Sequence, residues 1–109
     1  MKIKKTPEMT IEAVSQALTQ ELPDMKVSIK KNPIMGFKYV EVRKSSTVGT
    51  WIRINDKKER VQLQNCVPSA MVRGLAGGLI LFAFTVGPQN KLRKASGYIL
   101  KEKFSTTEM

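Results

Sequence analysis

The sequence contains no histidine and only one cysteine, Cys66. Histidine is the side chain whose ordinary pKa lies closest to neutral pH, and without one Cys66 has no imidazole partner to activate its thiol or to share a metal ion. The nine acidic residues fall mostly where helices or turns are expected, so that water solvates them. We therefore expect a protein that is not an enzyme, with no catalytic residue, no metal site and no cofactor.

The lone cysteine cannot form an intramolecular disulfide bond, which favours a reducing compartment. Residues 1–5 are charged like the start of a signal peptide, but Thr6, Pro7 and a polar helix pattern follow instead of an apolar core. Residues 105–109 carry neither an apolar anchor nor a cysteine for prenylation. We expect a cytoplasmic protein whose residues 1–5 and 105–109 are frayed, with attachment to the periphery of a membrane as the alternative.

Aromatic residues make up only 6% of the 109 residues, and no internal repeat is apparent. A chain of this length allows one domain with a modest core, because chains near 100 residues bury roughly two-thirds of their unfolded surface. We predict a single small basic domain over residues 1–109.

Negative charge is also scarce, since nineteen lysine and arginine residues face nine acidic ones and the formal net charge is +10. The excess is spread along the chain and is not gathered in a tail. A field of this sign attracts polyanions and is weakened by salt. We expect an anionic partner, which can be an acidic protein, a nucleic acid or an anionic lipid.

Hydrophobic periodicity predicts one helix and four strands in the first two-thirds of the chain. Apolar residues recur at three- and four-residue steps between residues 11 and 22, which indicates an amphipathic helix with Thr6 as its N-cap. Apolar and polar residues then alternate in four stretches, as is typical of half-buried strands. The four predicted strands cover residues 25–30, 37–44, 50–54 and 60–64.

The last third predicts two further helices. Ser69 can cap an apolar helix over about residues 70–86, which Gly87 and Pro88 end, and an amphipathic helix follows from about residue 89. Short loops between the strands favour antiparallel pairing. We predict an α+β fold of two layers, with a four-stranded antiparallel meander sheet, an N-terminal helix and two C-terminal helices packed on one face.

Residues 74–90 form the longest uncharged run, and its most apolar part, about residues 75–86, is too short to cross a bilayer as a helix. One interpretation makes residues 74–87 part of the core. The alternative places them in a homo-oligomer interface or on anionic lipid, with basic residues on both sides. The candidate residues for membrane or self-association are Gly74, Gly78, Leu79, Leu81, Phe82 and Phe84.

Alternation along the strands sends a basic and aromatic set of side chains to the sheet face away from the helices. Such a mixture suits single-stranded nucleic acid, because cations follow the phosphates and flat rings stack on bases. The alternative is a solvated face on which the rings cover the stems of lysine and arginine. The candidate residues for binding nucleic acid or another anion are Lys26, Lys30, Tyr39, Arg43, Trp51, Arg53 and Arg60, with Gln62, Gln64 and one acid, Glu41, beside them.

The sequence thus predicts a small non-enzymatic binding or assembly module. Its basic surface engages an anionic partner, and its apolar helix, about residues 70–86, lies in the core or in an oligomer interface. Two alternatives remain: a membrane-associated protein that docks on anionic lipid through residues 74–87, and a protein that binds single-stranded nucleic acid on the sheet face.

Overall fold

The computed structural model describes residues 1–32, 34–45, 48–66 and 78–109, and for residue 66 and residues 78–86 it describes the backbone alone. One antiparallel sheet contains five strands in the order β1-β5-β4-β3-β2. The elements in chain order are β1 (Lys2–Lys4), α1 (Ile11–Glu21), β2 (Lys26–Lys31), β3 (Lys38–Arg43), β4 (Gly49–Asn55), β5 (Arg60–Cys66) and α3 (Gly78–Lys103).

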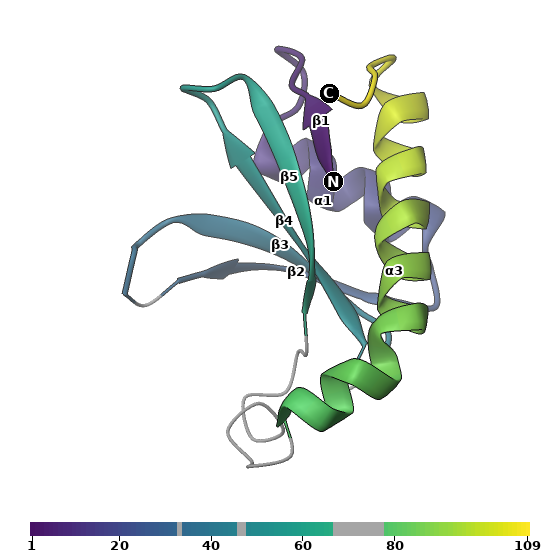
Figure 1. The fold of residues 1–109 in the computed structure, drawn as a ribbon. Coiled ribbons are helices and arrows are strands. Elements are labelled where there is room, and N and C mark those ends of the chain that lie inside the picture. Colours follow the sequence, from purple (N-terminus) through teal and green to yellow (C-terminus); the bar gives the residue numbers. More distant parts are fainter. Residues whose placement is uncertain (33, 46–47, 67–77) are drawn as a thin grey trace.

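Both helices lie on the same side of the sheet (Figure 1). Helix α1 packs on β2 and β3, helix α3 packs on β4 and β5, and the two helices contact each other. An α+β fold with an antiparallel sheet is therefore confirmed. The sheet has five strands where four were predicted, and the described residues form two helices where three were predicted.

The strand that the sequence did not predict, β1, lies at the edge of the sheet next to β5. Its three residues pair with Arg60, Val61 and Gln62. The far side of β1 also bonds, because Lys4 N donates to the carbonyl of Thr107 at 3.0 Å and Met109 N donates to the carbonyl of Lys2 at 2.9 Å. We expected residues 1–5 and 105–109 to be frayed, and the structure does not show this. Tertiary pairing holds the two segments, although neither has much strand signal of its own.

Helix α1 begins later than predicted, because Thr10 and not Thr6 is its N-cap. The Thr10 Oγ1 accepts a hydrogen bond from Ala13 N at 3.1 Å. Thr6 lies in the preceding turn, where its carbonyl accepts from Met9 N at 3.1 Å, and the Met9 side chain is fully buried. Both threonines carry the same capping signal. In the structure Met9 is buried in the turn that follows Thr6, and the helix starts only after Thr10.

The prediction of two C-terminal helices is wrong in the part of the chain that the structure describes. Helix α3 runs without interruption from Gly78 to Lys103 and contains Pro88. Proline has no N–H to donate to the carbonyl four residues earlier and its ring crowds that carbonyl, so a helix that continues through it bends. Figure 1 shows this bend, as the first turns of α3 leave the axis of the later ones. The predicted start of the apolar helix, near Ala70, lies outside the described residues.

The core lies between the sheet and the two helices. Helix α3 contributes Leu92 and Leu100, and Gly97 on the same helix lets the N-terminal residue approach closely, because a Cβ at position 97 would collide with the Met1 sulfur. The buried apolar residues of the core are Ile3, Met9, Val14, Leu18, Val40, Val42, Val48, Ile52, Val61, Leu63, Leu92 and Leu100.

Candidate nucleic-acid interface

The side of the sheet opposite the helices, here called the outer face, is defined by the strand register. Residues directly opposite each other in antiparallel strands share a face. Trp51 is opposite both Glu41 and Gln64, while its neighbours in sequence, Thr50 and Ile52, are buried on the helix side. By the same register and alternation the outer face carries Lys26, Lys30, Tyr39, Glu41, Arg43, Trp51, Arg53, Arg60, Gln62 and Gln64.

All seven residues that the sequence nominated for anion or nucleic-acid binding therefore lie on one face. Their role in binding stays a prediction. The face is open to solvent to different degrees: Lys26, Lys30 and Arg53 are exposed, whereas Tyr39 and Trp51 are half-buried.

Three aromatic rings form a contiguous row, from the residue before β3 through β3 to β4. The ring centroids of Phe37 and Tyr39 are 6.1 Å apart, and those of Tyr39 and Trp51 are 5.0 Å apart. These distances lie in the range of favourable aromatic pairs, and the ring planes are tilted in both pairs. We call Phe37, Tyr39 and Trp51 the aromatic row.

The aromatic row lies where the two hairpins of the sheet separate. Strand β3 pairs with β2 along its whole length, but with β4 only at residues 40–43, opposite residues 49–52. Beyond that contact the β2–β3 and β4–β5 hairpins point in different directions (Figure 1). Arg53 on β4 spans the gap, with its guanidinium carbon 4.1 Å from the centroid of the Phe37 ring.

A shallow hollow of about 70 Å³ opens on the outer face at this gap. Pockets that enclose a small ligand are usually about 300 Å³ or larger, so this hollow does not enclose one. It offers ring faces and side-chain amides at an open surface. Its lining residues are Phe37, Tyr39, Trp51, Arg53, Gln62 and Gln64.

The charge of the outer face is almost all positive. Its one acid, Glu41, has 4% of its surface exposed and its Oε1 lies 3.1 Å from Lys30 Nζ. Within the described part of the chain, no carboxylate lies within 4 Å of the other predicted cations, Lys26, Arg43, Arg53 and Arg60. The face can therefore attract an anion with charges that are not already neutralised.

Sequence reasoning missed three residues of this surface. Phe37 was placed in a predicted strand but given no role, although alternation puts it on the same face as Tyr39. Lys2 and Lys4 were assigned to a frayed end, yet their register partners are Gln62 and Arg60 on the outer face. No pattern in a three-residue strand could have revealed that these two lysines extend the basic surface.

The residues nominated for membrane or self-association are not tested by side-chain contacts. Gly74 lies outside the described residues. Gly78, Leu79, Leu81, Phe82 and Phe84 belong to the first turns of α3, where the backbone alone is described. Neither described helix combines the length and apolar character that crossing a bilayer requires.

Comparison with known proteins gives no family to which the fold or the outer face can be referred. No family model, no curated protein and no solved structure matches the chain.

Proposed function

We propose that this chain is a non-enzymatic binding module whose outer face binds single-stranded nucleic acid. The observation that carries the proposal is the aromatic row, with Arg53 over Phe37, in the middle of a face whose other charged side chains are basic apart from the paired Glu41. Stated without the identity of the partner, the proposal is that a basic module binds an anionic partner.

The arrangement separates the two tasks that a nucleotide chain requires. Rings in the centre provide faces for unstacked bases, and each stacked base contributes roughly 1–3 kcal/mol. Cations stand on both sides of the rings, with Lys26, Lys30 and Arg43 on β2 and β3, and Lys4 and Arg60 on β1 and β5. The phosphates of a strand that crosses the sheet would meet cations before and after the bases.

A solvated sheet face without a partner is the alternative. In that case the rings would serve to cover the stems of lysine and arginine. The rings of the aromatic row instead contact one another, and Arg53 covers Phe37 with its charged end. Four basic side chains that have no carboxylate nearby among the described residues favour an external anion over an internal partner.

A duplex is a poorer fit than a single strand. The bases of a duplex are stacked on each other and cannot lie on protein rings without being pulled apart.

Fluorescence anisotropy with labelled single-stranded and duplex oligonucleotides of the same sequence, over a range of salt concentrations, tests the proposal. Trp51→Ala should weaken single-strand binding by about 1–3 kcal/mol, the contribution of one stacked base. Tyr98→Ala is the matched control, because Tyr98 is an exposed aromatic residue on α3 and lies on no strand. Equal affinities for single strand and duplex, or equal losses in both variants, would remove the stacking role and leave nonspecific charge attraction.

A further inference from the structure

The tip of the β2–β3 hairpin exposes two large apolar side chains. Ile34 is 91% exposed and Met35 is 72% exposed, the two highest values among the large apolar residues that the structure describes. The hairpin projects away from the two helices (Figure 1), so neither side chain takes part in the core.

The backbone of this tip is held in place by Asn32. The Asn32 Oδ1 accepts hydrogen bonds from Ile34 N at 2.9 Å and from Met35 N at 2.8 Å. The backbone of Asn32 also bonds to Phe37 and Gly36, and Gly36 adopts the left-handed conformation that glycine tolerates best. The two apolar side chains therefore project from a preorganised turn.

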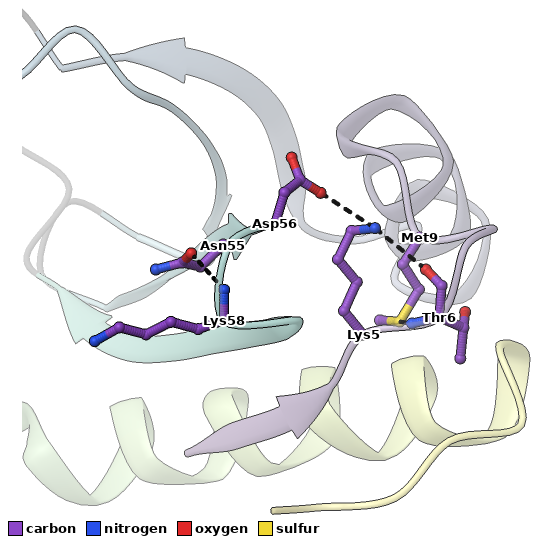
Figure 2. Close-up of polar contacts among 6 residues, drawn as sticks. All are labelled: Lys5, Thr6, Met9, Asn55, Asp56 and Lys58. Carbon is purple, nitrogen blue, oxygen red and sulfur yellow. Dashed lines mark hydrogen bonds and ion pairs between the residues drawn. The ribbon is translucent and has the colours of Figure 1, made fainter.

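The other long hairpin shows that such a turn does not need apolar residues. At the end of the β4–β5 hairpin, Asn55 Oδ1 accepts a hydrogen bond from Lys58 N at 3.2 Å (Figure 2). There the exposed residues are all charged: Asp56, Lys57, Lys58 and Glu59. An asparagine organises both turns, but only one of them presents aliphatic side chains to water.

A pair of lysines stands at the base of the apolar tip. Lys31 and Lys38 are direct partners in the β2–β3 register, and both are exposed. Like charges in this position destabilise the pair. No carboxylate lies within 4 Å of either one in the described residues, so an external anion would relieve their repulsion.

We infer that the β2–β3 tip docks on an anionic lipid bilayer, with Ile34 and Met35 in the acyl-chain boundary and with Lys31 and Lys38 on lipid phosphates or carboxylates. Aliphatic side chains have no flat face for stacking on bases, whereas hydrocarbon suits them, and the lysines provide charge complementarity to anionic headgroups. The four residues of this docking surface belong neither to the aromatic row nor to the segment 74–87 considered in the sequence analysis. It does not depend on the proposed binding of nucleic acid.

Sedimentation with vesicles of phosphatidylcholine, with and without phosphatidylserine, measures this docking. Ile34→Ser combined with Met35→Ser leaves the net charge unchanged and should weaken binding to the anionic vesicles by about 10- to 100-fold, as expected for two partly inserted side chains. The variant that combines Lys31→Ser with Lys38→Ser should bind the anionic vesicles roughly fivefold less tightly for each lysine removed. Lys57→Ser combined with Lys58→Ser removes the same charge from the other turn and serves as the control, with little loss.

Insertion can be observed separately with Ile34→Trp in a Trp51→Phe background. The new tryptophan should shift its emission to the blue and should be quenched by brominated lipids in anionic vesicles. The inference is overturned if the Ile34 and Met35 double variant binds vesicles as tightly as the unmodified protein does, or if the tryptophan emission does not change. It is also overturned if the Ile34 and Met35 double variant binds vesicles normally but has a different molecular mass in solution from the unmodified protein. The tip would then contact a second copy of the chain.

Discussion

The guanidinium carbon of Arg53 lies 4.1 Å from the centroid of the Phe37 ring, across the gap where β3 and β4 no longer pair. Phe37 also lines a groove of about 330 Å³ on the other side of the gap, beside Met9, Ile11 and Ile54. Lys5 and Asp56 also line that groove and form an ion pair at 3.2 Å, which ties the start of the chain to the β4–β5 turn (Figure 2). The contact between Arg53 and Phe37 thus joins the two hairpins at the point where the backbone hydrogen bonds between β3 and β4 end.

A double-mutant cycle with Arg53→Ala and Phe37→Ala should give a coupling free energy of about 0.5–1 kcal/mol, the value of an exposed cation–π contact. Urea unfolding of the four proteins measures it. A parallel cycle with Arg53→Ala and Tyr98→Ala is the control, and its two effects should be additive within about 0.5 kcal/mol. Additivity in both cycles would mean that the Arg53–Phe37 contact does not stabilise the fold.

Removal of the one acid on the outer face should strengthen binding of single strands. Glu41→Gln keeps the shape of the side chain and frees Lys30, and we expect a gain of roughly two- to fivefold, equivalent to the ~0.5–1 kcal/mol of a partly exposed ion pair. Anisotropy titrations at low salt measure the change. Glu102→Gln on α3 alters the net charge equally at an exposed site away from the sheet, so an equal gain there would show that only net charge matters.

Gly97→Ala tests the close contact between α3 and the N-terminal residue. Alanine favours a helix by about 1 kcal/mol over glycine, but its Cβ would displace the Met1 side chain, and overpacking costs about 1–3 kcal/mol. We expect the free energy of unfolding to be unchanged or lower. Ala95→Gly, at an exposed position of α3, measures the effect of helix propensity alone. If Gly97→Ala raises the free energy of unfolding by as much as Ala95→Gly lowers it, the close contact with Met1 is contradicted.

Pro88→Ala should straighten and stabilise α3. The substitution restores an N–H to the helix and removes the ring that crowds the preceding turn, so we expect a gain of about 1–3 kcal/mol in the free energy of unfolding. Urea unfolding measures the gain, and small-angle scattering measures the shape. Pro7→Ala, in the exposed turn before α1, should give no such gain. A loss of stability in Pro88→Ala would show that the bend itself is needed for packing.

The α-amino group of Met1 links stability to pH. It donates to the carbonyl of Leu63 at 3.1 Å, and burial, followed by repulsion from Arg93, lowers its pKa from the ordinary 8.0. The folded state therefore binds this proton less tightly than the unfolded chain does. The resulting contribution to stability is present above about pH 8 and is lost as the pH falls through the lowered pKa.

We expect the free energy of unfolding to rise with pH across that window. The chain has no histidine to titrate in the same range, which makes the amine easier to isolate. Urea unfolding of the unmodified and N-terminally acetylated proteins measures the effect, because acetylation removes the titrating group. Identical pH dependence in the two proteins would rule out the amine as its cause.

The sequence predicted the outer face well because β2 to β5 alternate clearly. Val40 and Val42 are buried, while Tyr39 and Glu41 lie on the opposite face, as the period of two requires. That regularity brought all seven nominated residues to one surface. Local pattern is sufficient where apolar and polar residues alternate along each strand.

Three features depended on tertiary structure and could not be read from local pattern. β1 has three residues and is held by β5 and by residues 107–109. Pro88 is a reliable end signal in an isolated helix, yet α3 continues through it, and Leu92 and Leu100 after it are buried in the core. The short β3–β4 contact depends on how two twisted hairpins meet, so the gap beneath Arg53 and Phe37 had no signature in the sequence.

The short contact between β3 and β4 gives the sheet a joint. The far halves of the two hairpins can change their mutual angle without breaking any ladder hydrogen bond, because the pairing between β3 and β4 ends at Val40 and Ile52, but such a change would separate Arg53 from the Phe37 ring. Rotation about this joint would alter the spacing between Tyr39 and Arg53 more than it would alter the helix-covered core. The aromatic row therefore straddles the end of the β3–β4 pairing, with Trp51 inside the paired segment and with Tyr39 and Phe37 beyond it.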